Sequence, residues 1–293
     1  MQKIFYFFYA IRPQTLIASI APVLMGSILC YKDNLFSLTI FYFTLFAAIL
    51  IQMMTNLIND LYDYKKGADK QNRIGPDRMM QKGYLTEKEI LFGIYCIFLC
   101  ALFIGIYLVI KGGVLILFIG LSSFLFAYLY TATCFSIAYN GLGEIFVFLY
   151  FGIIACMGTY YLQTLNISFE SLLLGSIVGC LNVNLLIINN IRDYLSDKLS
   201  KKNTLIVKYG ITFGRLEFIL MLILSYLFLY IFAVQVNNMM LFYKAIPMLL
   251  FIMYIIFKLM SDKSFVNHKA LPLFSIYILL FTSLLTYNIF YDI

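Results

Sequence analysis

The amino-acid sequence predicts an all-α integral membrane protein with nine transmembrane helices. Hydrophobic residues make up 63% of the 293 residues and charged residues only 12%, a composition typical of membrane proteins. Nine apolar stretches are each long enough to cross a bilayer, which requires about 20 apolar residues per helix. The charged residues gather in the connections between these stretches. Residues 1–293 are therefore expected to form a single transmembrane domain.

The predicted spans follow one another with short connections. They cover residues 11–31, 36–58, 88–110, 113–134, 141–163, 171–191, 213–236, 240–260 and 270–290. The first is expected to insert uncleaved, because the apolar run before Arg12 has no small-residue cleavage site of a secretory signal. The second and sixth end in clusters of acidic and amide residues. The third opens with Thr86-Glu-Lys-Glu89, which has the pattern of a capping box.

The basic residues predict the orientation in the membrane. With these nine spans, 18 of the 21 Lys and Arg residues fall on one side, against Lys32, Lys111 and Lys244 on the other. Short positively charged loops stay in the cytoplasm, so the N-terminus and both acidic clusters are expected there and the C-terminus outside. Because topology explains the net charge of +7, no nucleic-acid partner is expected.

The two acidic clusters carry the functional prediction. The first contains Asn56, Asn59, Asp60 and Asp63, with Asp69 in the following loop, and the second contains Asn189, Asn190, Asp193 and Asp197. Residues three or four apart share one face of a helix, so each cluster is expected to direct several oxygens to one point. Carboxylates at a membrane edge are costly unless cations meet them. Two such faces could hold Mg²⁺, which binds carboxylates together with substrate phosphates.

A simpler interpretation is that these acids cap helices or pair with neighbouring lysines. The recurrence of the pattern at the end of a second span argues against it. Basic residues near the acids are candidates for binding a diphosphate, since Arg offers forked donors and Lys a point charge. These are Arg78, Lys82, Arg192 and Lys202, with Arg73 weaker, while Arg12 and Tyr130 lie at span ends on the same side. The positive-inside rule and interfacial packing are the alternatives for them.

With these motifs, the chain resembles the UbiA superfamily of intramembrane prenyltransferases, and most closely its 1,4-dihydroxy-2-naphthoate polyprenyltransferase branch. The motifs are Asn59-Asp60-Leu-Tyr-Asp63 with Gly67 and Asp69, Arg73-Ile-Gly-Pro76 through Gln81-Lys-Gly83, Asn189-Asn-Ile-Arg-Asp193 with Asp197, and Lys202-Asn-Thr-Leu205. Arg12-Pro-Gln-Thr-Leu16 and Gly141-Leu-Gly-Glu144 also agree. The similarity covers nearly the whole chain.

The resemblance implies nine helices around a central cavity, a cytoplasmic cap and a portal open to lipid, in a protein of the bacterial inner (cell) membrane. It implies that Asn59, Asp63, Asp69, Asn189, Asp193 and Asp197 hold Mg²⁺ and the diphosphate. Two positions depart from the superfamily pattern. Gly67 stands where many members have the last acid of the first motif, and residues 131–139 lack the basic residue that relatives often have there.

The resulting expectation is an enzyme that transfers a polyprenyl group from its diphosphate to 1,4-dihydroxy-2-naphthoate, with loss of carbon dioxide, giving demethylmenaquinol. Asp60, Asp63 and Asp193 are the catalytic candidates, and the acid that takes the phenolic proton is left open. The alternative within the class is a prenyltransferase for 4-hydroxybenzoate or another quinone ring. The alternative from another class is a divalent-cation transporter, although transporter sites lie near the membrane midplane rather than at helix ends beside basic loops.

Overall fold

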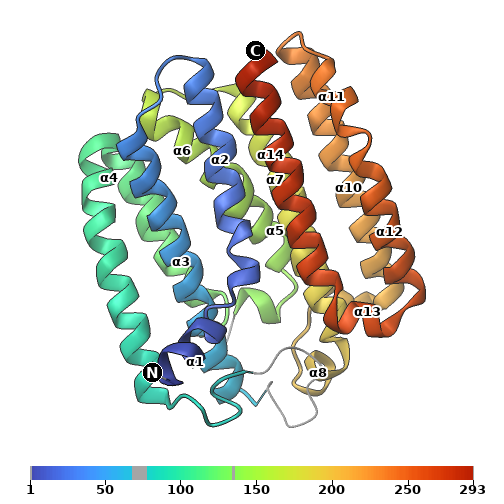
Figure 1. Cartoon of the computed structure of the whole chain (residues 1–293). Coiled ribbons are helices and arrows are strands. Elements are labelled where there is room, and N and C mark those ends of the chain that lie inside the picture. Colours follow the sequence, from blue (N-terminus) through green and yellow to red (C-terminus); the bar gives the residue numbers. More distant parts are fainter. Residues whose placement is uncertain (1, 68–77, 134–135, 293) are drawn as a thin grey trace.

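A computed structural model describes residues 2–67, 78–133 and 136–292 (Figure 1). Every regular element in these ranges is a helix, which confirms the all-α prediction. From the N-terminus, the elements are α1 Gln2–Ala10, η1 Pro13–Thr15, α2 Ile17–Lys32, α3 Leu38–Lys65, α4 Glu87–Leu129, η2 Ile137–Tyr139, α5 Gly143–Phe148, η3 Leu149–Ile154 and α6 Ala155–Thr164. They continue with α7 Phe169–Arg192, α8 Tyr194–Leu199, α9 Leu205–Tyr209, α10 Ile211–Gln235, α11 Met240–Ala245, α12 Met248–Ser261, α13 Lys263–His268 and α14 Ala270–Asp292.

The described residues contain six helical segments long and apolar enough to cross a membrane. They are α3, α4, the continuous segment Gly143–Thr164, α7, α10 and α14, and the bent pair of α1–η1 with α2 makes a seventh. The sequence predicted nine. The difference arises because α4 contains the predicted span 88–110 and most of the predicted span 113–134, and the predicted span 240–260 divides between α11 and the 14-residue helix α12.

The 43 residues of α4 form two antiparallel halves rather than one straight rod. A straight helix of that length would extend about 65 Å, roughly twice the thickness of a bilayer core. Gly113 has φ 69° and ψ −155°, which interrupts the helix, and glycine adopts this backbone conformation at no steric cost. The rings of Phe98 and Phe124 then meet with centroids 5.0 Å apart, although 26 positions separate them in the sequence. The chain folds back at this break (Figure 1).

Helix α7 is the central column of the molecule, because 89% of an 18-residue apolar stretch within it is buried, compared with 11% of such a stretch in α4. It packs closely against the π-helical turn η3 because glycines face each other across the interface. A Cβ atom on Gly152 would lie only 2.4 Å from the Cα atom of Gly179. Small residues spaced four apart permit such close approach of helices within a membrane.

The ends of α3 and α7 that carry the two acidic clusters lie at the same end of the molecule as the N-terminus (Figure 1). The C-terminus lies at the opposite end. The predicted capping box is confirmed: Thr86 Oγ1 accepts from the Glu89 backbone N–H, and the Glu89 carboxylate accepts from the Thr86 N–H. It fixes the start of α4 beside the end of α3.

Candidate active site

A polar cavity of about 160 Å³ lies between the ends of α3 and α7, the start of α2 and the connection from α4 to α5. It brings together most of the site residues predicted from the sequence. Those lining it are Arg12, Asn56, Asn59, Asp63, Arg78, Tyr130, Asn189, Asn190, Arg192, Asp193 and Lys202. The two clusters, about 130 residues apart in the chain, thus face one space, as the helix-end positions predicted.

In the first cluster, Asp63 is held through both of its carboxylate oxygens. Oδ2 accepts from Arg78 Nη2 at 3.0 Å, and Oδ1 accepts from the Tyr139 hydroxyl at 3.0 Å. Asp60, 1% exposed, lies 3.8 Å from Arg78 Nη1 and lines an adjoining cavity under α1 rather than the polar cavity. Buried charges are tolerated when each has an opposite partner, so Arg78 stabilises both carboxylates.

The second cluster is formed at a corner of the chain. The prediction that Asn189, Asp193 and Asp197 share one continuous helix face is wrong at Asp193, where φ −88° and ψ 7° end α7 and begin α8. Arg192 donates to both Asp193 oxygens, from Nε at 2.8 Å and Nη2 at 2.9 Å. Lys202 Nζ lies 3.6 Å from Asp197 Oδ1. Asp197 is buried but does not line the polar cavity.

The sequence prediction missed two residues, Lys66 and Thr131, that fix the connection from α4 to α5 over the first cluster. Lys66 donates to the carbonyls of Thr131 and Thr133 and to Ser136 Oγ, at 2.6, 2.7 and 2.9 Å. Thr131 Oγ1 donates to Asn59 Oδ1. The lack of a basic residue in 131–139 indicated that a cation must come from elsewhere, and Lys66 at the end of α3 supplies it to this connection.

Tyr139 connects both clusters. The ammonium groups of Lys66 and Lys202 lie over its ring, 4.3 and 5.6 Å from the ring centroid, while its hydroxyl donates to Asp63. Its backbone carbonyl accepts from the Asn203 N–H at 3.1 Å. Cation–π contacts of this kind add attraction to the hydrogen bonds. The loops after α4 and α7 are therefore held together at the site.

Tyr130 and Asn190 line the wall near the start of α5. Asn190 Nδ2 donates to Glu144 Oε1 at 3.2 Å, which holds another carboxyl group at the cavity beside Asp63 and Asp193. Desolvation raises the pKa of Tyr130, and the nearby Glu144 and Asp63 raise it further. Tyr130 is therefore a neutral hydroxyl, able to donate a hydrogen bond, at physiological pH.

The remaining predicted residues lie elsewhere. Lys82 is exposed and lies outside the polar cavity and its neighbours. Asp69 and Arg73 fall outside the described residues. Arg12, in the left-handed conformation at φ 52°, lines both the polar cavity and the cavity under α1.

The donors at the polar cavity suit a hard divalent cation. In residues 2–67, 78–133 and 136–292, no group of three or more His, Cys, Asp or Glu side chains is gathered as a metal-binding cluster. Carboxylate and amide oxygens from Asn59, Asp63, Asn189 and Asp193 nevertheless line opposite walls of the cavity. Oxygen ligands from one or two carboxylates, completed by phosphate, are the usual environment of Mg²⁺, so these residues fit such an ion.

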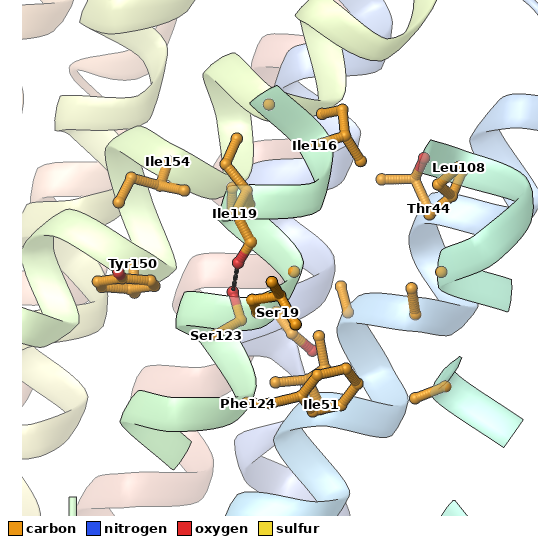
Figure 2. Close-up of a pocket in the computed structure, with 18 of the residues that line it drawn as sticks. Ser19, Thr44, Ile51, Leu108, Ile116, Ile119, Ser123, Phe124, Tyr150 and Ile154 are labelled. Carbon is orange, nitrogen blue, oxygen red and sulfur yellow. Dashed lines mark hydrogen bonds between the residues drawn. The ribbon is translucent and has the colours of Figure 1, made fainter. Parts of the chain in front are cut away.

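An apolar cavity of about 360 Å³ adjoins the polar one. Figure 2 shows aliphatic and aromatic side chains such as Ile51, Ile119 and Phe124 facing it from several helices. Thr55, Tyr130, Val147 and Phe151 line both cavities, so the two meet at these residues. A ligand with a charged head and a long apolar chain matches this pair of cavities.

The fold and these cavities define a helical integral membrane protein whose polar cavity opens toward an apolar one. The family model of the UbiA prenyltransferase family matches residues 19–279. The chain belongs to this family and is a prenyltransferase.

Curated relatives and solved structures agree with this assignment. The chain is 34% identical over 231 residues to the 1,4-dihydroxy-2-naphthoate octaprenyltransferase of Haemophilus influenzae, covering 76% of this chain and 75% of the relative. It is 35% identical over 207 residues to the protein of that name from Escherichia coli, covering 69% and 67%. A UbiA homolog from Archaeoglobus fulgidus bound to GPP and Mg²⁺ superposes with a TM-score of 0.67 at 14% identity, covering 97% and 99%, and so shares the fold.

Proposed function

We propose that this prenyltransferase moves a polyprenyl group from polyprenyl diphosphate to 1,4-dihydroxy-2-naphthoate, with release of carbon dioxide, giving demethylmenaquinol. The observation that carries the proposal is the meeting of the polar and apolar cavities at Thr55, Tyr130, Val147 and Phe151. It would put the reacting carbon of the prenyl chain between the charged groups and the apolar cavity. The names of the two bacterial relatives support the choice of acceptor.

Mg²⁺ is the proposed cofactor, held by Asn59, Asp63, Asp69, Asp193 and Asp197 with the substrate diphosphate. When bound, the ion supplies Lewis-acid neutralisation of the leaving diphosphate. Asn56, Asn189 and Asn190 are proposed to orient the diphosphate by donating amide hydrogens. Arg12, Arg78, Arg192 and Lys202, which line the polar cavity, are proposed to supply the remaining positive charge, and the forked guanidinium groups suit phosphate oxygens.

The chemical step exchanges one carbon substituent for another. The C–O bond to diphosphate breaks, and the cationic groups stabilise the charge that develops on the leaving oxygens. A C–C bond then forms at the ring carbon that carries the carboxylate, and the bond to that carboxylate breaks to release carbon dioxide, returning its electron pair to the ring. The apolar cavity keeps water from the allylic cation. A carboxylate is proposed to take and return the phenolic proton, and Asp60, in the adjoining cavity under α1, is among the candidates.

We also propose nine membrane passes in one domain, with the site on the cytoplasmic side of a bacterial inner membrane under a cap of polar loops. Nine results when the two halves of α4 count as two passes and α11 with α12 counts as one. The termini at opposite ends of the molecule agree with an odd number (Figure 1). The excess of basic residues at the N-terminal end supports a cytoplasmic site.

A competition experiment tests the proposed acceptor. Purified protein in lipid nanodiscs is incubated with equimolar 1,4-dihydroxy-2-naphthoate and 4-hydroxybenzoate, one prenyl diphosphate and Mg²⁺. The lipid products are identified by mass spectrometry. Decarboxylated prenyl-naphthalenediol as the main product supports the proposal. Prenylated 4-hydroxybenzoate that retains its carboxylate would favour the alternative acceptor.

A further inference from the structure

Two buried amide side chains line the polar cavity deeper in the membrane than the acidic clusters. Gln52 lies seven residues before Asn59 on α3, and Asn182 lies seven residues before Asn189 on α7. Seven residues are about two helical turns, so both lie roughly 10 Å toward the membrane interior from the clusters. Gln52 is 8% exposed and Asn182 is 2% exposed. Each has a buried side-chain oxygen with no hydrogen-bond partner in the described part of the chain.

Two helix irregularities fix the orientation of Asn182. Pro22 has no N–H, so the carbonyl of Ala18, four residues earlier in α2, lacks its usual helical donor. Phe151 lies in the π-helical turn η3, where the regular i to i+4 bonding is interrupted. Asn182 Nδ2 donates to both carbonyls, at 2.9 Å to Ala18 O and 2.6 Å to Phe151 O. Both partners are hydrogen-bond acceptors, so the group that faces them must be the NH₂ of the Asn182 amide. The side-chain oxygen Oδ1 therefore points away from both carbonyls.

Gln52 is oriented by the same argument at the neighbouring turn. Its Nε2 faces Thr15 Oγ1 at 3.5 Å. The Thr15 hydroxyl donates its own hydrogen to the Arg12 carbonyl at 2.9 Å, so toward Gln52 it can only accept. The amide nitrogen therefore faces Thr15 and Oε1 faces away from it. Thr15 and Ala18 are three residues apart at the start of α2, so the two amides flank the same helix end.

A ligand that satisfies these two oxygens must carry hydrogen-bond donors. An ionised diphosphate and a prenyl chain have none, whereas the hydroxyl groups of a phenolic acceptor do. Phe151 lines both cavities, and the Asn182 amide donates to its carbonyl. The Asn182 amide, with its oxygen, therefore lies near the junction of the two cavities. We propose that the side-chain oxygens of Gln52 and Asn182 form a hydroxyl-recognition subsite that selects a dihydroxylated aromatic ring and holds it at the junction of the two cavities. This inference rests on the proposed function for the class of acceptor.

Binding of substrate analogues tests the subsite without turnover. The full chain in nanodiscs is titrated calorimetrically with 1,4-dihydroxy-2-naphthoate and with its two analogues that each lack one hydroxyl. Sites that hydrogen-bond a hydroxyl reject analogues lacking it, because a buried acceptor is then left unsatisfied. The wild-type protein is expected to bind the dihydroxy acid about 10- to 100-fold more tightly than each analogue, since one buried hydrogen bond accounts for a difference of this order.

Gln52→Met keeps the size of the side chain and removes the acceptor, so it should abolish discrimination against one analogue. Asn182→Leu is made together with Pro22→Ala, which restores an N–H for the Ala18 carbonyl, and it should abolish discrimination against the other. Asn184→Leu is the matched control, because Asn184 is fully buried on the same helix, two residues from Asn182, and lines none of the three cavities described.

Thermal unfolding of each variant confirms that it is folded before titration. The proposal is overturned if both folded variants retain the wild-type discrimination, if the wild-type protein shows none, or if Asn184→Leu loses it equally. Failure of the proposed function is separate. If product analysis shows prenylated 4-hydroxybenzoate instead, the titrations are repeated with 4-hydroxybenzoate and benzoate in place of the naphthoates. Loss of discrimination between these two ligands in the Gln52 or Asn182 variants would still support the subsite.

Discussion

At the scale of single residues, arginines neutralise the acids on both walls of the polar cavity. Arg78 forms ion pairs with Asp63 and Asp60, and Arg192 donates two hydrogen bonds to Asp193. Buried pairs of this kind contribute little net stability, but removing one partner leaves an uncompensated charge. Under the proposed function, Mg²⁺ would take the place of arginine at these carboxylates, and the arginines would bind the diphosphate.

Asp63→Asn is expected to lower kcat by about 100- to 1,000-fold, because it removes one charge from a preorganised electrostatic site. Asp193→Asn should have a similar effect, and the double variant should lose little more, since residues that act as a unit are not additive. Steady-state assays with prenyl diphosphate measure this.

Glu87→Gln is the control for these variants, because Glu87 pairs with Lys65 at the exposed start of α4. It should leave kcat unchanged. Near-normal, Mg²⁺-dependent activity of either single variant would contradict a joint site.

The predictable part of the site follows from short-range spacing. Asn59, Asp63, Asn189 and Asp193 were identified because helical periodicity groups them within one or two turns. Tyr139 was not predicted because its partner Asp63 is 76 residues away in the sequence. Asn182 was not predicted because its carbonyl partners, on two other helices, are available only where the regular hydrogen bonding of those helices is interrupted. Lys82 was named for its nearness in sequence alone, and its exposure shows that nearness does not bring a long side chain into a cavity.

At the scale of secondary-structure elements, backbone breaks set the shape of the site. Gly113 divides α4, Asp193 separates α7 from α8, and η3 widens the helix beside Asn182. Hydrophobic periodicity gave the positions of the apolar segments, and the capping box gave the start of α4. The apolar runs predicted a boundary between residues 110 and 113, where Gly113 breaks α4, but they did not reveal that α7 ends at Asp193.

Lys66→Met should reduce kcat by about 10-fold or more while leaving the fold intact, because a misplaced catalytic loop can cost this much. The Thr131 and Thr133 carbonyls would lose their ammonium donor, and the ring of Tyr139 would lose its nearest cation. Lys66→Arg retains charge and donors and should recover part of the rate. Equal rates for Lys66→Met and the wild-type protein would remove Lys66 from this positioning role.

Gly152→Ala is expected to destabilise the protein by about 1 to 3 kcal/mol through overpacking. The added Cβ would lie 2.4 Å from the Gly179 Cα, which is backbone and cannot rotate away. Gly105→Ala is the control, since nothing lies within 4 Å of its Cβ position. Thermal unfolding in detergent measures both, and an unchanged midpoint for Gly152→Ala would contradict the close packing of α7 on η3.

At the scale of the whole molecule, the fold brings the ends of α3 and α7 to one face and the C-terminus to the other (Figure 1). The apolar cavity then extends into the membrane interior while the charged groups remain near one surface. This arrangement matches a substrate whose head is charged and whose chain dissolves in lipid.

The proposed orientation is tested by thiol labelling of intact cells with a membrane-impermeant reagent, in a variant lacking the six native cysteines. A cysteine at Lys201 should be protected until the cells are opened, whereas one at Lys111 should react at once, because positively charged loops remain in the cytoplasm. The opposite pattern would reverse the topology and move the site outside.

The proposed coupling of prenyl transfer to decarboxylation is tested most directly by following the carboxyl carbon of the acceptor. Purified protein, octaprenyl diphosphate, Mg²⁺ and carboxyl-labelled 1,4-dihydroxy-2-naphthoate are incubated, and labelled carbon dioxide and prenylated product are quantified in parallel. One carbon dioxide is expected for each prenyl group transferred, because in the proposed reaction the new C–C bond forms where the carboxylate leaves. Prenylated product that retains the label, or release of label without prenyl diphosphate, would contradict it.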